Sequence, residues 1–176
     1  RVGLARALAT DAEILLMDEA FSALDPLIRT DMQGILLGLQ EELHKTIVFI
    51  THDLDEALRI GDEISILRDG EVVQQGTSQE IVMTPSDDYI ADFIKDVNRA
   101  RVLEVRSIME PSKTDKGPRL DLTTPLEDAM GKLSEAGETS ACVVDDKGHV
   151  IGKIELSAAI SAIKRPEKTS NELRYR

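Results

Sequence analysis

The sequence predicts an α/β protein: a partial parallel sheet with helices, followed by a small second α/β domain. Three observations lead to this fold class. Residues 14–17 (ILLM) and 46–51 (TIVFIT) are short apolar runs with an amphipathic segment between them, in strand–helix–strand order. A second strand–helix–strand pattern starts after a stretch with Pro and Gly near residue 118. With 176 residues, of which 41% are hydrophobic, the chain can form the cores that two small units need.

The first strand, residues 14–17, is expected to be a central strand covered on both faces, because it is apolar throughout. The second, residues 46–51, is expected to be another buried strand, because it is rich in β-branched residues. Asp25 followed by Pro26 predicts a helix N-cap with proline in the first turn. The helix is expected to place one face on the sheet, with Ile28, Met32, Ile35, Leu36, Leu39 and Leu43, and the other in water, with Arg29, Asp31, Gln33, Glu41 and Glu42.

A strand–helix–strand unit is normally parallel and right-handed, so both strand ends lie on one carboxyl edge. Asp18 and His52 are therefore expected at the same edge, where open α/β sheets bind ligands.

The rest of the first domain is predicted to be mainly helical around one hairpin. Residues 54–60 (LDEALRI) form a short helix, and residues 63–76 form a hairpin that turns at Asp69-Gly70. Thr77 and Glu80 make a capping box, and another helix follows Pro85. This domain is expected to span residues 1–97, with residues 98–118 as a linker.

The second domain is expected over residues 119–164. Its predicted elements are strands at 120–122, 140–144 and 150–154, a helix at 126–137 that starts at a Thr124-Pro125 cap, and a final helix to about Lys164. Residues 165–176 are a polar tail.

The adjacent acids Asp18 and Glu19 follow directly on the first strand. Neighbouring side chains at a strand end point to opposite sides, so the two carboxylates serve different purposes. In nucleotide hydrolysis, one acid at a strand end holds the magnesium ion while another group orients or deprotonates the attacking water. The alternative is a strand that ends in a solvated turn.

The longer pattern decides between these interpretations. The order of strand, Asp-Glu, small-residue loop, helix, strand and His-Asp resembles the second half of an ATP-binding-cassette (ABC) ATPase, over residues 1–97. The resemblance implies that Asp18 is the Walker B acid at Mg²⁺ and that Glu19 is the general base for water. It also implies that the loop from Ser22 to Asp25 meets ATP and the opposite subunit, and that His52 is the switch residue that senses the γ-phosphate.

Two sequence segments are more similar to one branch of that family than to the family in general. DEAFSALDPLIRTDMQ (18–33) and ITHDLDEALRIGDEISILRDGEVVQQGT (50–77) resemble the ATPase of the quaternary-amine importers, which take up glycine betaine and proline-type osmoprotectants. That branch carries a C-terminal sensor of CBS motifs, and VRSIMEPS (105–112) through DDKGHVIGKIELSAAISAI (145–163) is similar to one such motif.

This resemblance implies an ATPase subunit that dimerises around two nucleotides and drives a membrane permease. The further implied partner is a periplasmic or extracellular substrate-binding protein, and the implied location is the cytoplasmic face of the inner membrane. Three alternatives stay open: the ATPase of another ABC importer, a regulatory CBS module with an inactive cassette remnant, and a soluble cassette protein of translation or repair.

Two motifs of the family do not occur in the sequence: the G-x-x-x-x-G-K-[ST] loop and the Ser-Gly-Gly signature. The family places both before the position of Arg1, so we expect that the chain begins in the middle of a domain. Without the glycine-rich loop there is no backbone nest for phosphates. The chain by itself is therefore expected neither to bind ATP firmly nor to hydrolyse it.

Charge and composition exclude other classes. The net charge of −12 and the lack of Trp argue against nucleic-acid binding. No apolar run approaches the roughly 20 residues of a membrane span, so we expect membrane association through partners. The single Cys142 fits a buried structural thiol in a reducing cytoplasm. His44 and His149 receive no role.

Two further expectations concern the C-terminal part. After Ile163, five basic and two acidic residues give the end of the chain a net charge of +3, which could contact anionic lipid or simply be solvated. CBS modules usually place a hydroxyl and, three residues on, an Asp where Glu155 and Ala158 stand here. We therefore expect no tight adenine nucleotide, and a motif that pairs with a second copy in a dimer responsive to ionic strength.

Overall fold

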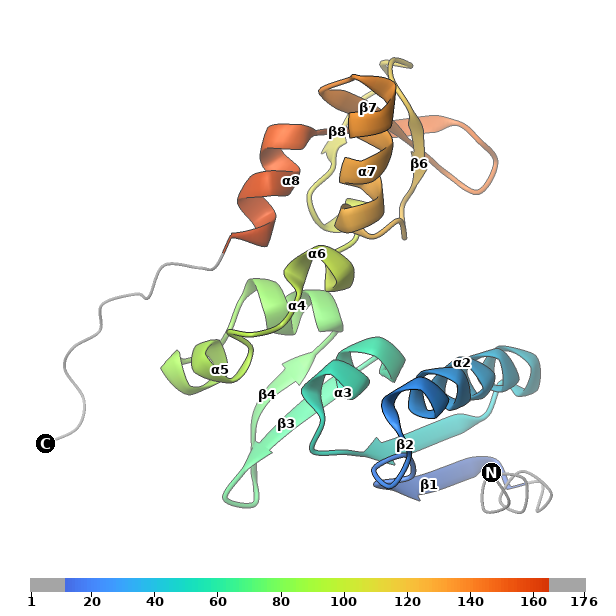
Figure 1. Ribbon diagram of the computed structural model, residues 1–176, viewed down its shortest axis with the longest axis vertical. Coiled ribbons are helices and arrows are strands. Elements are labelled where there is room, and N and C mark those ends of the chain that lie inside the picture. Colours follow the sequence, from blue (N-terminus) through green and yellow to red (C-terminus); the bar gives the residue numbers. More distant parts are fainter. Residues whose placement is uncertain (1–11, 165–176) are drawn as a thin grey trace, which may run out of the picture. The chain divides into compact units, whose positions relative to one another are not determined.

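A computed structural model describes residues 12–164 of the chain, and it divides the chain into two compact units (Figure 1). The N-terminal unit is Arg1–Asp62 and the C-terminal unit is Glu63–Arg176. The predicted basic tail, residues 165–176, lies outside the described residues. Each unit is described by itself.

The N-terminal unit is the predicted strand–helix–strand crossover. Strand β1 (Ile14–Asp18) pairs in parallel with β2 (Thr46–Ile50), and helix α2 (Pro26–Leu43) connects them. Helix α3 (Leu54–Ile60) follows β2. Parallel strands need such a crossover connection, which explains why two apolar runs so far apart in sequence become neighbours.

Helix α2 begins at the predicted cap. The Asp25 carboxylate accepts a hydrogen bond from the Ile28 N–H at 3.0 Å, and Pro26 occupies the first turn. At the other end, His44 adopts a left-handed conformation, with φ of 52°, and its N–H donates to the Gln40 carbonyl at 2.8 Å. His44 therefore has a structural role as the C-cap of α2.

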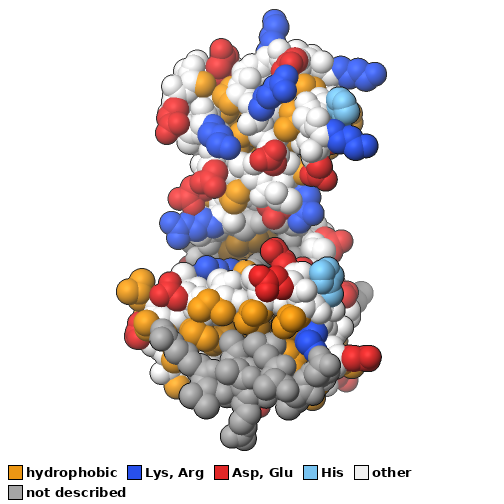
Figure 2. Space-filling view, turned by 90° about the vertical axis from the view of Figure 1, so that its right-hand side faces the viewer, with side chains coloured by type: hydrophobic (Ala, Val, Ile, Leu, Met, Phe, Trp, Pro, Cys, Tyr) orange, Lys and Arg blue, Asp and Glu red, His pale blue; other side chains and the backbone are white. Residues whose placement is uncertain are grey.

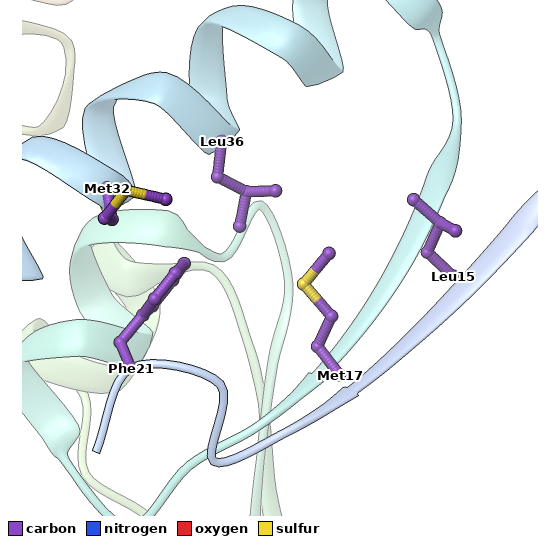
Figure 3. Close-up of a cluster of buried hydrophobic side chains, with 5 residues drawn as sticks. All are labelled: Leu15, Met17, Phe21, Met32 and Leu36. Atoms are coloured by element: carbon purple, nitrogen blue, oxygen red, sulfur yellow. The ribbon is translucent and has the colours of Figure 1, made fainter. Parts of the chain in front are cut away.

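The core of this unit lies between β1 and α2 (Figure 3). Leu15 and Met17 project from β1 toward Met32 and Leu36 of α2, and Phe21 closes the cluster from the loop that follows β1. The five side chains are at most 7% exposed. Alternation along β1 thus places every second residue in the core.

The predictions that β1 is covered on both faces and that β2 is buried are wrong for the described residues. The other face of the pair is open, with exposed fractions of 59% for Ile14, 78% for Leu16, 46% for Val48 and 58% for Ile50. Leu16 and Val48 are cross-strand partners on that face. A continuous apolar run predicted two covering layers, whereas residues 12–164 supply only one, on the α2 side.

The predicted faces of α2 also need correction. Gln33 is only 4% exposed although it was expected in water, while Ile35 and Leu43 are 52% and 43% exposed although they were expected on the sheet. The buried stripe is centred on Met32 and Leu36. Gln33 lies beside that stripe, where its amide has a buried hydrogen-bond partner.

The C-terminal unit starts with the predicted hairpin, β3 (Ile64–Arg68) and β4 (Glu71–Gly76). Asp69 and Gly70 form its turn with φ of 53° and 83°, as the Asp-Gly pair predicts. Helices α4 (Ser78–Met83) and α5 (Asp88–Phe93) follow. The capping box at the start of α4 is confirmed, because Thr77 and Glu80 exchange side chain–backbone hydrogen bonds.

Residues 98–111, in the segment predicted to be a linker and the lead-in to the second domain, contain regular structure. They form α6 (Arg99–Val102), a 3₁₀ turn (Val105–Ser107) and strand β5 (Glu110–Pro111). Leu103 and Val105 are fully buried, which is why this polar-looking stretch is ordered. The division of the sequence into domains at residue 97 stays a prediction.

The predicted second α/β pattern forms a four-stranded sheet. Strands β6 (Arg119–Asp121), β7 (Ser140–Val144) and β8 (Val150–Glu155) join β5 in the order β5-β8-β7-β6, with β6 and β7 parallel and the other pairs antiparallel. Helix α7 (Leu126–Ala136) connects β6 to β7, and α8 (Leu156–Ile163) follows β8.

The start of α7 differs in one detail from the prediction. Its N-cap is Pro125, and no side chain caps the helix. The Thr124 hydroxyl instead accepts a hydrogen bond from the Asp121 N–H at 3.1 Å, so it closes the turn after β6. The helix ends at Gly137 in a left-handed conformation, as predicted.

The surface shows how apolar and charged side chains are distributed. Figure 2 shows a row of hydrophobic side chains on the lower part of the molecule and interspersed acidic and basic side chains on the upper part. Among residues 12–164, no helix has both the length and the apolar character to cross a membrane.

Candidate functional site

The ends of β1 and β2 lie side by side, as the parallel crossover predicted. Asp18, the last residue of β1, pairs in register with Ile50, the last residue of β2. Glu19 then leaves the strand in a left-handed conformation with φ of 48°, and its N–H donates to the Ile50 carbonyl at 2.9 Å. This turn directs Glu19 toward the residues that follow β2.

Glu19 and His52 are in direct contact. One carboxylate oxygen of Glu19, Oε1, lies 2.6 Å from His52 Nδ1 and accepts a hydrogen bond from the His52 N–H at 3.2 Å. The hydrogen bond and the negative charge of Glu19 raise the pKa of His52. The imidazole is 78% exposed, so its Nε2 edge is accessible to a ligand while Nδ1 contacts Glu19.

The loop after Glu19 folds back onto the same residue. Ser22 donates twice to the Glu19 carbonyl, from its hydroxyl at 2.9 Å and from its N–H at 3.2 Å. Asp25 uses its carboxylate to cap α2. Ser22 and Asp25 are both exposed, so this loop presents polar groups to its surroundings.

Arg29 and Asp53 belong to this site, although the sequence did not point to them. Arg29 Nη1 donates to Asp53 Oδ2 at 2.9 Å, and both side chains are about one third exposed or less, at 27% and 33%. Arg29 Nη2 donates to the Ser22 and Leu24 carbonyls at 3.3 and 3.5 Å. The guanidinium therefore joins the loop after β1 to the residue that follows His52.

A second polar contact lies one helical turn further along α2. Gln33 Nε2 donates to Glu56 Oε1 at 2.9 Å, and both residues are buried, at 4% and 5% exposed. Arg29 and Gln33 are spaced i and i+4 on α2, and Asp53 and Glu56 are spaced i and i+3 at the start of α3. This matched spacing of polar residues on two helices is the signal that could have revealed the pair.

The site fits a magnesium nucleotide only in part. Asp18 is an exposed carboxylate that could supply one oxygen ligand to a divalent cation, and the outer edge of His52 could donate to a phosphate oxygen. Within the described part of the chain, no group of three or more His, Cys, Asp or Glu side chains is arranged to hold a metal ion. The printed sequence contains no glycine-rich phosphate loop.

The remaining histidine and the cysteine have structural environments. His149 Nδ1 lies 3.2 Å from Asp145 in the turn between β7 and β8. Cys142 is a buried free thiol, and burial together with nearby Asp115 raises its pKa. Neither residue lies in the unit that contains Glu19 and His52.

Sequence comparison gives strong matches to curated proteins. The chain is 59% identical over 170 residues to the glycine betaine/proline betaine transport system ATP-binding protein ProV of Escherichia coli, covering 95% of this chain and 42% of that protein. It is 52% identical over 165 residues to the glycine betaine transport ATP-binding protein OpuAA of Bacillus subtilis, covering 92% and 38%. With the trimethylamine N-oxide transport system ATP-binding protein TmoW of Pelagibacter ubique it shares 40% identity over 171 residues, covering 96% and 50%.

The chain thus spans between 38% and 50% of the length of these three relatives. No protein-family model matches it. Among solved structures, a CBS-domain pair with bound AMP from Klebsiella pneumoniae aligns over 65% of this chain and 84% of that chain, at 16% identity and a TM-score of 0.25. That likeness is too low to carry an argument.

Proposed function

The chain is a homologue of the ATP-binding subunits of glycine betaine and related osmoprotectant ABC importers, and on this basis we propose that it is part of an ATPase subunit that powers such uptake. The supporting observation is identity of 40–59% across nearly the whole chain. Because the three relatives carry different substrate names, we propose small quaternary amines and their close analogues as the substrate class.

We assign Glu19 the role of general base. Its Oε1 is held by the His52 backbone and ring, while its side chain is 35% exposed and reachable from solvent. A carboxylate so fixed can accept a proton from water without first reorganising. In the whole subunit, bound ATP with Mg²⁺ would supply the phosphoanhydride bond that is cleaved.

Asp18 and His52 are assigned to the nucleotide. Asp18 is exposed at the end of β1 and would provide one oxygen ligand to Mg²⁺. His52 would direct Nε2 to a phosphate oxygen while Nδ1 stays on Glu19, so that the base and the phosphate contact are coupled through one ring. Ser22 and Asp25, in the exposed loop that follows, would face ATP and a second copy of the subunit.

The proposed partners are a second ATPase subunit, a transmembrane permease and a substrate-binding protein outside the membrane. The proposed location is the cytoplasmic face of the inner membrane, as a peripheral subunit. The small α/β sheet β5-β8-β7-β6 would act as a CBS-type regulatory module. Contact of the basic tail with anionic lipid stays a secondary proposal, and its residues 165–176 lie outside the described part.

The test uses the full-length subunit with its permease and compares wild type with Glu19→Gln and Asp18→Asn. The expected result is that Glu19→Gln abolishes ATP hydrolysis and glycine betaine uptake but still binds ATP, because only the proton acceptor is lost. Asp18→Asn should weaken Mg²⁺-dependent ATP binding. Normal hydrolysis by Glu19→Gln would overturn the assignment of the base.

The same preparation tests two further points. A full-length protein that shows no ATP turnover in the wild type would favour the alternative, a regulatory CBS module with a cassette remnant. We also propose that the 176-residue chain alone is inactive, and this chain should give no phosphate release under conditions in which the full-length subunit turns over.

A further inference from the structure

The contacts around Glu19 form a closed ring of bonded groups. Starting at the carboxylate, Glu19 Oε1 contacts His52, and His52 is joined by the chain to Asp53. Asp53 pairs with Arg29 at 2.9 Å, and Arg29 contacts the Ser22 carbonyl at 3.3 Å. Ser22 closes the ring with two hydrogen bonds to the Glu19 carbonyl.

Arg29 is the member of the ring that joins its two halves. One nitrogen, Nη1, contacts the turn after β2 through Asp53, and the other, Nη2, contacts the loop after β1 through the Ser22 and Leu24 carbonyls. The planar fork of a guanidinium can hold two such partners at fixed directions, which an ammonium group does not do. Arg29 Nε is also buried and has no acceptor among the described residues. The guanidinium therefore makes its hydrogen bonds through its two terminal nitrogens.

Asp53 has a matching double role. One carboxylate oxygen, Oδ1, accepts from the Glu56 N–H at 3.2 Å and caps α3, while the other, Oδ2, receives Arg29. The backbone N–H of Asp53 donates to the Thr51 hydroxyl at 3.0 Å. The peptide that carries His52 is therefore fixed on the side toward α3 by contacts that do not involve Glu19.

We propose that Arg29 and Asp53 are positioning residues, which hold His52 and the loop at Ser22 in register on Glu19 and couple the two. Neither side chain contacts Glu19 directly. Their effect is to limit how far the His52 turn and the loop can move apart, and a general base loses efficiency when it is displaced by as little as 1 Å. This inference rests on the proposed function of Glu19 and His52.

The alternative is that Arg29 and Asp53 only hold α2 against α3. The chain offers a matched control for that role, because the Gln33 and Glu56 side chains join the same two helices through a hydrogen bond to each other, and the Glu56 N–H that caps onto Asp53 is kept in any substitution. Replacing both by methionine removes the hydrogen bond without leaving a buried partner unpaired, which keeps the cost in stability small. The double variant Gln33→Met/Glu56→Met thus tests helix packing by itself.

The experiment measures kcat and KM for ATP in the full-length subunit, with the amount of folded enzyme taken from the stoichiometry of bound ATP. Variants are Arg29→Met, Arg29→Lys, Asp53→Asn and the Arg29→Met/Asp53→Asn pair. Arg29→Met should lower kcat about tenfold or more, with a smaller change in KM, because the geometry of the base changes while Arg29 itself is not assigned to ATP. Asp53→Asn should behave similarly, although asparagine still caps α3.

Two comparisons identify the mechanism. The Arg29→Met/Asp53→Asn pair should lose no more activity than the worse single variant, because both act through one contact. Arg29→Lys should not restore kcat, and the Gln33→Met/Glu56→Met control should keep it.

The inference is overturned if Arg29→Met has normal kcat, or if the control loses as much activity as Arg29→Met does. Failure of the proposed function is distinguishable, because it would appear as normal hydrolysis by Glu19→Gln whatever Arg29→Met does.

Discussion

A single oxygen of Glu19 contacts both the ring and the backbone of His52, at 2.6 and 3.2 Å. A carboxylate at this distance stabilises the charged form of the imidazole, and the backbone contact fixes where the pair lies. The Glu19–His52 contact therefore affects the pKa of His52 and the pH dependence of stability.

Glu19→Gln should lower the pKa of His52. The hydrogen bond and charge of Glu19 are the largest causes of the raised pKa in the folded chain, and glutamine keeps the shape but not the charge. The measurement is an NMR titration of the His52 ring in the 176-residue chain, with the signal assigned by its loss in His52→Gln. An unchanged pKa would show that the Glu19 contact does not form in solution.

The same pair predicts the direction of a pH effect on stability. Because the folded pKa of His52 is raised, its contribution to stability is fully present below the unfolded value of about 6.5 and is lost as pH rises through the folded pKa. As the pH rises from about 6.5 through the folded pKa of His52, the unfolding temperature of the wild type should therefore decrease more than that of Glu19→Gln. His44 and His149 are unchanged in both proteins and cancel in the comparison.

Residues of the site that stand at strand ends could be predicted from the sequence, whereas a pair of residues far apart in the chain could not. The sequence could place Asp18, Glu19 and His52 near one another because they stand at the ends of two apolar runs, and parallel strands end at one edge. Arg29 was assigned to water because a charged residue on the polar side of one helix gives no sign of its partner. That partner, Asp53, is 24 residues away at the start of another helix, whose position the pattern does not specify.

The same limit explains the errors in the fold. The sequence predicted the start of α2, because it depends on local chemistry at Asp25 and Pro26, whereas His44, which caps the other end, had been given no role. The sequence did not predict the open face at Leu16 or the burial of Leu103, because both depend on which layers the rest of the chain supplies.

The one-sided sheet of the N-terminal unit predicts unequal effects of two leucine truncations in the 176-residue chain. Leu36→Ala removes a side chain that is 1% exposed and should cost about 2–5 kcal/mol. Leu16→Ala removes one that is 78% exposed and should cost less than about 0.5 kcal/mol. Hydrogen exchange of the α2 amides in increasing urea reports this unit, and equal losses would contradict the open face.

Arg99 and Arg101 lie in the same short helix, α6, but their replacement should cost different amounts of stability. Its guanidinium donates to the carbonyls of Val82, at the end of α4, and Ala162, in α8, and burial lowers its pKa. Arg99→Met leaves these carbonyls without their donor and should cost about 2 kcal/mol in the C-terminal unit.

Arg101→Met is the matched control. Arg101 pairs with Glu127 on the surface, where the two side chains are 71% and 48% exposed, so its loss should cost less than about 1 kcal/mol. Urea unfolding followed by hydrogen exchange of β7 compares the two variants. A larger effect of Arg101→Met would show that Arg99 does not join α4 to α8 in solution.

Alanine substitutions at Gly117 and Gly148 should separate the cost of a steric clash from the cost of the left-handed backbone. Both have φ of 78°, but a Cβ at Gly117 would lie 2.2 Å from the Ser140 carbonyl oxygen, whereas one at Gly148 would meet no atom within 4 Å. Gly148→Ala should cost about 1–2 kcal/mol for the left-handed backbone alone. Gly117→Ala should cost clearly more in the same urea titration, and equal costs would mean that the backbone at residue 117 moves freely.

The last prediction is that the C-terminal unit does not bind AMP or ATP tightly. If the C-terminal sheet is the proposed CBS-type module, Glu155 and Ala158 stand where such modules usually carry a hydroxyl and an aspartate, and both are exposed here. The nearby cation, Lys153, is already paired with Glu155 at 3.0 Å and Glu110 at 3.5 Å, so the local charge is negative. A phosphate would meet like-charge repulsion, and alanine would leave ribose hydroxyls without an acceptor.

Calorimetric titration of the 176-residue chain with AMP and with ATP should give no binding tighter than about 1 mM. The double variant Glu155→Thr/Ala158→Asp restores both residue types at these positions and removes one carboxylate from Lys153. It should therefore bind AMP more tightly than the wild type does, since the Lys153 ammonium group then keeps one carboxylate partner, Glu110, instead of two. Micromolar binding of either nucleotide by the wild type would show that the negative charge around Lys153 does not prevent nucleotide binding.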